Sequence, residues 1–265
     1  METVFHIFGL MAKNSTLHLV GLIDPQVLSA IEADSMSPVF LDLQACNTLE
    51  IRYDFFREQE WPTLSERLRK VAPHAMQIGT IRLVEDGGLY PSAKAINRLE
   101  QWERILEKDQ VPEWLDLERD YLSQFEKLKK MATPRGVKIL VSEHNFIRIP
   151  SDMELKTFAD DLRRVKAPGL KISAMSNSKT DCERLYKFTK KSSKYFDLFG
   201  AFGMGATGKT SRLWSLKEGG NLTYGCITEA KAPGQIDVIT MQKALENFET
   251  IFSESEIEHF LRKFE

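Results

Sequence analysis

Short apolar stretches alternate with amphipathic stretches along most of the chain, and the pair recurs eight times. The apolar stretches have the length of strands, and the amphipathic stretches have the spacing of helices. A strand followed by a helix, repeated about every 30 residues, is typical of a (β/α)8 barrel. We therefore predict an α/β chain folded as a (β/α)8 TIM barrel, with an open doubly wound sheet as the alternative architecture.

The predicted elements run from Leu17 to Phe264. The eight predicted strands are Leu17–Ile23, Thr48–Asp54, Met76–Leu83, Trp114–Glu118, Val137–Ser142, Leu170–Met175, Asp197–Met204 and Leu222–Ile227. The predicted helices are Pro25–Ala33, Thr63–Val71, Ser92–Glu107, Asp120–Met131, Asp152–Val165, Thr180–Lys190, Gly208–Lys217, Ile236–Phe252 and Glu254–Phe264. We expect one barrel domain over residues 1–265, with a short N-terminal extension (1–16) and an extra C-terminal helix (254–264).

The composition argues against several classes of function. The 265 residues are 42% hydrophobic and 28% charged with a net charge of −2, so no basic surface predicts binding to nucleic acid or a membrane. No apolar run approaches the ~18 residues of a spanning helix, and the N-terminus does not read as a signal peptide. Three scattered cysteines favour the cytoplasm, and no histidine pair has the spacing of a metal site.

Charged residues gather where the predicted strands end, which is the face on which barrel enzymes build their sites. Alternation puts Glu50, Arg52 and Asp54 on one face of the second strand, where three buried charges are costly unless they are paired. The other polar residues near strand ends are Arg82 and Asp86 with Gly87-Gly88, Asp116 and Glu118, and His144. A histidine at this rim is a candidate acid or base, although a lone loop histidine is more often structural.

Lys171 lies in the middle of the sixth apolar stretch, Gly169–Met175. One interpretation is an ordinary lysine whose stem follows the strand while its ammonium reaches solvent. The other is a lysine that has lost its water, whose lowered pKa leaves a free amine able to attack a carbonyl. On the second interpretation, a histidine on the neighbouring strand completes a site for acid–base chemistry.

The segment Gly203–Thr210 satisfies the phosphate-loop pattern G-x-x-x-x-G-K-[ST] between a strand and a helix. Only one strand follows it, and that strand does not end in the aspartate that would hold magnesium. Nucleotide hydrolysis is therefore disfavoured. Glycine-rich backbone at a helix start, with Arg212 on the first turn, suits a carboxylate as well as a phosphate.

Several short motifs, in this order and at these spacings, resemble type I 3-dehydroquinate dehydratase, the lyase of the shikimate pathway. The motifs are Glu50-Ile-Arg52-Tyr-Asp54, Arg82 with Gly87-Gly88, Asp116-Leu-Glu118, Val141-Ser-Glu-His144-Asn-Phe, Lys171-Ile-Ser-Ala-Met, Ser211-Arg212 and Ala232-Pro233-Gly234-Gln235. Each motif is weak alone. The resemblance extends from the second predicted strand to Gln235.

The resemblance implies a (β/α)8 barrel, commonly a homodimer, that needs no metal or organic cofactor. Its substrate would be 3-dehydroquinate, which loses water to give 3-dehydroshikimate. Lys171 would form a Schiff base with the substrate ketone, because an iminium is a stronger electron sink than a ketone. His144 would remove the C2 proton and return it to the departing hydroxyl.

The resemblance also implies roles for the remaining site residues. Arg212 would hold the substrate carboxylate, and Glu50, Arg52 and Arg82 would hold hydroxyls and set the electrostatics, the arginines helping to keep Lys171 unprotonated. The segment Ala230–Gln235 would be a lid, with Gln235 touching substrate.

Two positions depart from the family pattern. Asp86 stands where the family usually has a glutamate that orients the histidine, and Lys231 stands where the lid usually has serine. These changes put rate and substrate fit in doubt more than reaction class. Two alternatives stay open: a catalytically impaired homologue, and another lysine-imine enzyme such as an aldolase.

Overall fold

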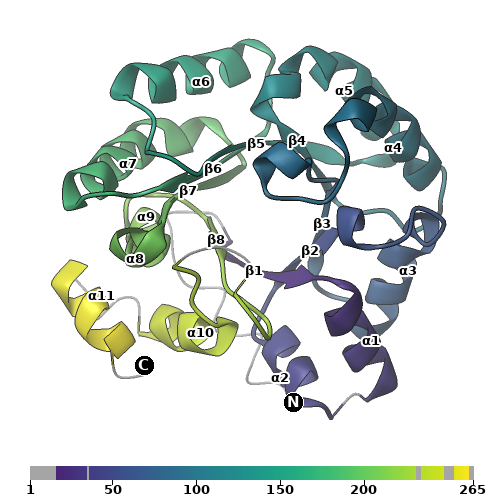
Figure 1. The fold of residues 1–265 in the computed structure, drawn as a ribbon, viewed down its shortest axis with the longest axis horizontal. Helices are drawn as coiled ribbons and strands as arrows, with labels where there is room; N and C mark the ends of the chain where they lie inside the picture. Colours follow the sequence, from purple (N-terminus) through teal and green to yellow (C-terminus); the bar gives the residue numbers. More distant parts are fainter. Residues whose placement is uncertain (1–15, 35, 231–233, 248–253, 263–265) are drawn as a thin grey trace.

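Parallel strands form a ring whose outer side is covered by helices, as the computed structural model in Figure 1 shows. The structure describes residues 16–34, 36–230, 234–247 and 254–262. The strands are β1 His18–Ile23, β2 Thr48–Arg52, β3 Met76–Thr80, β4 Trp114–Glu118, β5 Lys138–Asn145, β6 Gly169–Met175, β7 Leu198–Met204 and β8 Leu222–Tyr224.

Helices and short 3₁₀ turns connect the strands on the outside of the ring. The helices are α1 Pro25–Ala33, α2 Pro38–Gln44, α3 Trp61–Val71, α4 Arg98–Leu106, α5 Phe125–Ala132, α6 Asp152–Arg164, α7 Lys179–Ser192, α8 Gly205–Gly208, α9 Ser211–Lys217, α10 Val238–Glu246 and α11 Glu254–Leu261. The 3₁₀ turns are η2 Tyr53–Phe55, η3 Val84–Asp86, η4 Ser92–Asn97, η5 Arg119–Gln124, η6 Thr133–Arg135 and η7 Ser193–Tyr195.

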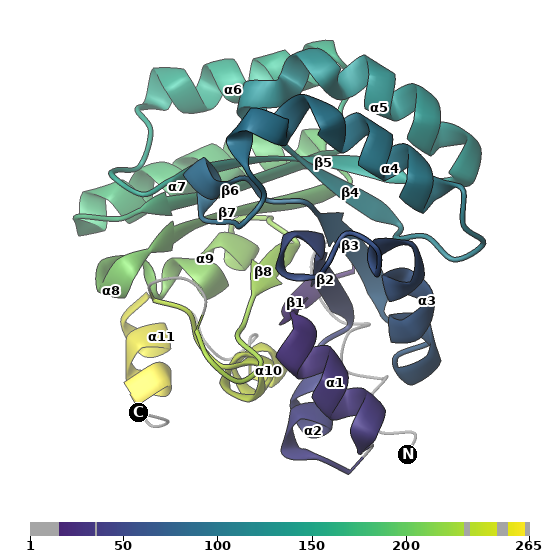
Figure 2. The same ribbon diagram turned by 45° about the vertical axis from the view of Figure 1, so that its right-hand side comes forward.

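The order of the strands confirms the (β/α)8 barrel and rules out the open doubly wound sheet. Eight strands follow one another in the order β7-β6-β5-β4-β3-β2-β1-β8, and each neighbouring pair is parallel. A doubly wound sheet would reverse its strand order partway across. Figure 2 shows the same ring from another side, with β8 returning next to β1.

Asn221 closes the ring at the seam between β7 and β8. Its backbone N–H donates to the Phe199 carbonyl (2.9 Å), and its side-chain oxygen accepts from the Phe199 N–H (2.8 Å). Its side-chain amide donates to the Asp197 carbonyl (2.8 Å), while its own carbonyl accepts from the His18 N–H (2.7 Å). One buried residue therefore replaces a regular ladder between these two strands.

We expect Asn221→Ala to lower the free energy of unfolding by about 2–4 kcal/mol, because the buried Phe199 N–H and the partly buried Asp197 carbonyl lose their partners and each costs about 1–3 kcal/mol. Urea denaturation measures this change. Asn247→Ala is the matched control, since Asn247 is exposed at the end of α10, and it should change stability little. Equal losses in both variants would show that the seam does not depend on Asn221.

The structure differs from the sequence prediction at a few boundaries. Helix α2 was not predicted, although Ser37 accepts a hydrogen bond from the Phe40 N–H and Pro38 occupies the first turn, both ordinary signals of a helix start. Strand β2 ends at Arg52, so Asp54 belongs to η2 rather than to the strand. The predicted extension at residues 1–16 lies outside the described residues except for Thr16.

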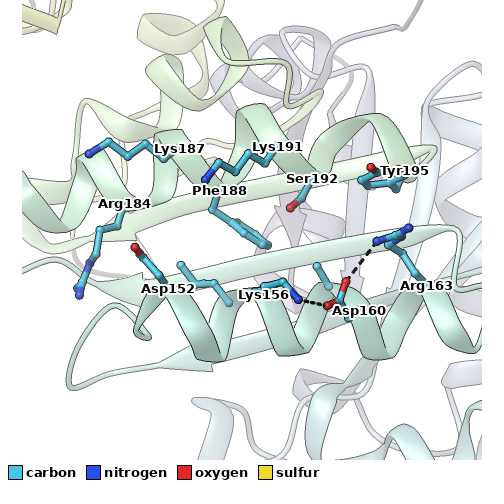
Figure 3. Close-up of a pocket in the computed structure, with 12 residues that line it drawn as sticks. Asp152, Lys156, Asp160, Arg163, Arg184, Lys187, Phe188, Lys191, Ser192 and Tyr195 are labelled. Atoms are coloured by element: carbon cyan, nitrogen blue, oxygen red, sulfur yellow. Dashed lines mark hydrogen bonds and ion pairs between the residues drawn. The ribbon is translucent and has the colours of Figure 1, made fainter.

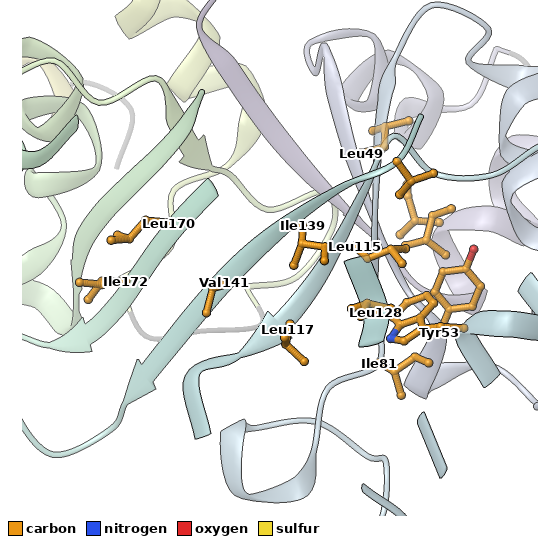
Figure 4. Packing of buried hydrophobic residues seen from close by; sticks show 14 of the residues in the cluster. Leu49, Tyr53, Ile81, Leu115, Leu117, Leu128, Ile139, Val141, Leu170 and Ile172 are labelled. Atoms are coloured by element: carbon orange, nitrogen blue, oxygen red, sulfur yellow. The ribbon is translucent and has the colours of Figure 1, made fainter. Parts of the chain in front are cut away.

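The apolar core lies mainly between the strands and the helices. Outward-facing strand residues such as Leu49, Leu115 and Ile172 are fully buried there, as the close-up in Figure 4 shows. Inside the ring, the layer near the amino ends of the strands is also apolar, and it includes Ile78, Trp114, Leu140, Leu198 and Leu222. The layer above it, toward the carboxyl ends, is charged, and alternation brings both layers to the inner face.

Candidate active site

Eight charged side chains are buried together inside the upper half of the barrel. They are Glu50, Arg52, Asp54, Arg82, Arg98, Asp116, Glu118 and Lys171, each at most 9% exposed. Four are carboxylates and four are cations when the Lys171 nitrogen is protonated, and Arg212, 1% exposed in the same cavity, is a further buried cation outside their ion pairs. A buried charge without a partner is costly, and the ion pairs of the cluster offset that cost.

Lys171 points into the barrel from the middle of β6 and is 4% exposed. Its Nζ lies 3.3 Å from Glu50 Oε2, 3.7 Å from Asp116 Oδ2 and 4.1 Å from the centre of the Tyr224 ring. The family resemblance led us to expect that nearby arginines would help to keep the amine uncharged. The structure also gives Lys171 two carboxylate counter-ions and an aromatic face, all of which stabilise an ammonium.

Arg82 connects the carboxylates of neighbouring strands. Its guanidinium pairs with Asp116 (2.8 Å) and with Glu118 (3.3 Å) and donates to the Ser142 hydroxyl (2.9 Å). The Ser142 hydroxyl donates in turn to Asp116 Oδ1 (2.6 Å). Arg98, from the start of α4, pairs with the other oxygen of Glu118. Burial lowers the pKa of Arg82, but Asp116, Glu118 and Glu50 outweigh burial and raise it, so this arginine stays charged.

Asp54 fixes the loop that follows β3. Its two oxygens accept from Arg52 at 2.9 and 2.7 Å, and also from the backbone N–H groups of Arg82 (3.2 Å) and Leu89 (3.0 Å). The loop turns back sharply at Gly88, where a Cβ atom would come within 2.1 Å of the Arg82 carbonyl oxygen. Glycine is therefore required there for the loop to reach Asp54.

His144 lies near the end of β5, and the strand register pairs it with Ser173, two residues beyond Lys171. Burial, followed by the nearby charges of Arg82, Lys171 and Arg52, lowers the pKa of His144 well below its ordinary value. The imidazole is therefore neutral at neutral pH and can accept a proton. Its Nδ1 is buried and has no hydrogen-bond partner among the described residues, Asp86 included.

Asp86 ends the turn η3 and is partly buried at the mouth of the barrel. Burial raises the pKa of Asp86 to about 6; Arg82 opposes this shift, and Glu118, Asp116 and Asp120 add to it. Its carboxyl group therefore gains or loses its proton close to neutral pH.

This raised pKa predicts a pH-dependent effect of Asp86 on stability. The folded protein binds the Asp86 proton more tightly than the unfolded chain does, so ionisation of Asp86 costs stability as the pH rises from about 4 to about 6. Urea denaturation should show that Asp86→Asn gains stability relative to the wild type across this window, with a constant difference above about pH 7. A difference that shrinks as the pH rises would contradict the raised pKa.

Arg212 enters the site from the first turn of α9 and is 1% exposed. Its Nε donates to the Gly234 carbonyl (3.1 Å), and its guanidinium lies over the Phe202 ring, 4.8 Å from the centre. Burial lowers the pKa of Arg212 to about 10. Within the described part of the chain no carboxylate pairs with it, so an anionic ligand would supply the missing counter-charge.

The phosphate-loop pattern does not form an open cradle. The Gly203 N–H donates to the Ser211 hydroxyl (2.7 Å), and a Cβ on Gly208 would lie 2.4 Å from the Gly203 carbonyl carbon. The loop is therefore packed on itself, and one of the amides that would bind a phosphate is already used.

Eight predicted site residues line one cavity of about 120 Å³ at the carboxyl ends of the strands: Glu50, Arg52, Arg82, Asp86, His144, Lys171, Arg212 and Gln235. The ninth, Lys231, lies outside the described residues. A cavity of this size admits a small polar molecule. A larger groove of about 350 Å³ between α6 and α7, shown in Figure 3, contains none of the eight.

Sequence reasoning missed some residues of the cavity. Tyr224, Ser173 and Phe202 line it, and Ser142 lies directly beneath it as the partner of Arg82 and Asp116. Alternation could have identified Ser142 and Ser173, because each lies two residues from a predicted site residue on its own strand. Among the described residues, no group of three or more His, Cys, Asp or Glu could hold a metal ion, and no helix is long and apolar enough to cross a membrane.

The ring of strands and the charged cavity at their carboxyl ends define a (β/α)8-barrel enzyme with a lysine buried in its interior. A sequence profile of the type I 3-dehydroquinase family matches residues 31–251. The chain belongs to this family.

Relatives agree with this assignment, and solved structures share the fold. The catabolic 3-dehydroquinate dehydratase of Acinetobacter baylyi is 31% identical over 188 residues, covering 69% of this chain and 67% of that protein. The 3-dehydroquinate dehydratase of Hydrogenobaculum is 28% identical, covering 82% and 96%. The crystal structure of 3-dehydroquinate dehydratase from Geobacillus kaustophilus superimposes with a TM-score of 0.78 at 21% identity, and the match covers 89% of this chain and 93% of that one. The structure from Aquifex aeolicus superimposes with a TM-score of 0.70 at 25% identity, and the match covers 86% of this chain and 97% of that one.

Proposed function

We propose that this chain dehydrates 3-dehydroquinate to 3-dehydroshikimate through an imine on Lys171, as a step of the shikimate pathway. The observation that carries this proposal is the buried Lys171, which shares one small cavity with a neutral histidine. Membership of the type I 3-dehydroquinase family supports the reaction class, and the names of the relatives support the substrate.

Imine formation begins with the transfer of a proton from the Lys171 ammonium, for which neutral His144 is the acceptor in the same cavity. The amine then attacks the ketone carbon. His144 gives its proton to the carbinolamine oxygen, so the imidazole is neutral again, and this oxygen leaves as water when the nitrogen forms the C=N bond. His144 next removes the C2 proton, and the electron pair moves into the iminium. The same imidazolium protonates the departing hydroxyl.

The other cavity residues would bind and orient the substrate. Arg212 is the group for the substrate carboxylate, because it is buried and charged and has no carboxylate partner within the described ranges. Glu50, Arg52 and Arg82 are the candidates for the hydroxyl groups. Gln235 and Lys231 would close over the substrate from the segment 230–235, whose Gly234 packs against the backbone of Gly205.

The chemistry of this proposal needs neither a metal nor an organic cofactor, since the lysine itself supplies the electron sink. We propose that the protein acts as a homodimer, as the family resemblance implies, and in the cytoplasm, as its three scattered cysteines suggest. We also propose one catalytic barrel domain over residues 1–265, with a short N-terminal extension (1–16) and an extra C-terminal helix (254–264). Size-exclusion chromatography with light scattering measures the oligomeric state directly.

Incubation of the purified chain with 3-dehydroquinate tests the proposed function. The expected result is a rise in the ultraviolet absorbance of the conjugated enone in 3-dehydroshikimate. An aldolase-like enzyme would cleave a carbon–carbon bond instead and would produce carbonyl fragments without that absorbance. No absorbance change at saturating substrate would contradict the dehydratase.

One observation favours a catalytically impaired homologue as a second candidate. His144 Nδ1 has no partner among the described residues, and the shorter Asp86 stands where the family usually has glutamate. We expect Asp86→Glu to raise kcat by about 10- to 100-fold if the added methylene lets the carboxylate reach Nδ1, because small misplacements of catalytic supports can cost about 10²-fold. Steady-state kinetics measures it, and an unchanged or lower kcat would show that Asp86 is already adequate.

A further inference from the structure

We infer that Asp116 is a catalytic residue whose carboxylate is the permanent counter-ion of the Lys171 nitrogen, and that it keeps the imine nitrogen protonated. The inference rests on the proposed function, because it concerns the imine that Lys171 forms there. A protonated imine is the strong electron sink of the reaction, and the neutral imine is a weak one.

Asp116 is held rigidly beneath the lysine. It is 2% exposed in the middle of β4, with Oδ1 bonded to the Ser142 hydroxyl (2.6 Å) and Oδ2 paired with Arg82 (2.8 Å) and with Lys171 Nζ (3.7 Å). A hydrogen bond from Ser142 on β5 and an ion pair with Arg82, just after β3, therefore hold the carboxylate independently of the lysine. A charge fixed in advance stabilises a cation without reorganisation when the cation forms.

The Glu50 carboxylate is nearer to Lys171 Nζ, at 3.3 Å, but it lies on a different side of the nitrogen from Asp116. Glu50 lines the cavity, so it faces the space that substrate would fill, whereas Asp116 does not line it. A bound substrate carrying hydroxyl groups would compete for Glu50. Asp116 lies on the side of the nitrogen away from the cavity and stays paired with it after the imine has formed.

The charge balance of the cluster points the same way. Within the network of ion pairs, three arginines face four carboxylates, and the Lys171 cation completes the pairing, whereas Arg212 in the same cavity pairs with none of these carboxylates among the described residues. Before the reaction the Lys171 nitrogen is positive as an ammonium. After water has left, it is positive as an iminium, because its lone pair has completed the C=N bond. A neutral imine would leave one carboxylate uncompensated in a buried site.

The groups that face the Lys171 nitrogen come from several strands. Glu50 and Arg52 lie on β2, Arg82 just after β3, Asp116 on β4, His144 on β5 and Tyr224 on β8. Arg52, Arg82 and a protonated His144 repel a cation there, so the two carboxylates must outweigh them. Removal of the Asp116 carboxylate should therefore make the imine lose its proton at lower pH.

The matched pair Asp116→Asn and Glu118→Gln tests this inference. Glu118 lies two residues further along β4, is equally buried at 2% and also pairs with Arg82, but the structure pairs it with Arg98 rather than with Lys171. Both variants remove one negative charge from the cluster while keeping the shape of the side chain. Only Asp116→Asn removes the contact with the reacting nitrogen.

The measurement is the yield of borohydride-reduced adduct on Lys171, by mass spectrometry, together with kcat, as functions of pH with saturating 3-dehydroquinate. We expect Asp116→Asn to lower kcat on the order of 100-fold and to move the alkaline limb of both profiles by about 1–3 pH units to lower pH, the size of shift that a charge within 4–6 Å causes. Glu118→Gln should leave the limb at its wild-type position.

The outcomes separate the inference from the proposed function. If the wild type forms no adduct on Lys171, the proposed function fails. Suppose that borohydride traps the wild-type adduct on Lys171 but the alkaline limb of Asp116→Asn stays at the wild-type pH. Asp116 is then not the specific counter-ion, and the same holds if the limbs of Asp116→Asn and Glu118→Gln shift equally. Asp116→Glu should restore the limb because it restores the charge.

Circular dichroism checks that each variant is folded. Should Asp116→Asn fail to fold, Ser142→Ala replaces it, since that change keeps the Asp116 carboxylate and removes the hydroxyl that donates to it and accepts from Arg82. The limb should then move to higher pH, and a limb that does not move would overturn the inference.

Discussion

Lys171→Met is expected to abolish dehydration, lowering kcat by at least about 10⁴-fold, because the covalent route is lost and the substrate ketone is a poor electron sink. The side chain keeps most of its volume, so the cavity should still bind 3-dehydroquinate through Arg212. Binding without turnover is then the signature of this variant. Stopped-flow absorbance and isothermal calorimetry measure the two quantities separately.

The same substitution should also destabilise the fold. Glu50 and Asp116 would lose the cation that lies 3.3 and 3.7 Å away, and breaking a buried ion pair costs about 3–5 kcal/mol. Lys171→Arg is the control, because it keeps a positive charge but cannot form an imine. It should recover much of the stability and none of the activity. Appreciable turnover by Lys171→Arg would contradict a covalent mechanism.

His144→Asn is expected to lower kcat by about 10²- to 10⁴-fold, the usual contribution of a general acid–base group. Asparagine keeps a polar side chain at the cavity wall but has no group that titrates. The imine on Lys171 should still form, more slowly, and should accumulate because the C2 proton is no longer removed. Borohydride trapping should therefore succeed in a variant that hardly turns over, and steady-state kinetics gives the loss in kcat.

His74→Asn is the control for this prediction, since His74 is exposed in the loop that precedes β3, at the opposite end of the barrel. It should leave kcat and trapping unchanged. If His144→Asn kept wild-type turnover, another group in the cavity would have to move the C2 proton. Asp86, with its pKa raised to about 6, would be the first to examine.

Local patterns were sufficient to predict the fold and most of the cavity. Apolar runs such as Gly169–Met175 became strands with a buried inner face, and eight strand–helix units left the ring as the natural closed arrangement. Alternation along a strand also put Glu50 and Arg52 on the inner face. These predictions succeed because a strand repeats every two residues, so one buried position fixes the others.

Pairing across the barrel could not be predicted in the same way. Lys171 meets Glu50, which is 121 residues away in sequence, and no local pattern says which inward residues of the ring touch. For that reason the two carboxylates nearest the Lys171 nitrogen, Glu50 and Asp116, were not predicted as its partners. Tyr224 was predicted only as part of a strand. Its aromatic ring lies against the Lys171 nitrogen because β8 pairs with β1 and closes the barrel.

The most direct test of the lysine mechanism is a crystal structure of the wild-type chain reduced with borohydride after soaking with 3-dehydroquinate. Continuous electron density from Lys171 Nζ to a ligand carbon, with Asp116 still beside the nitrogen, is the predicted result. A ligand lying unattached in the cavity, with the Lys171 side chain bonded only to Glu50 and Asp116, would contradict it.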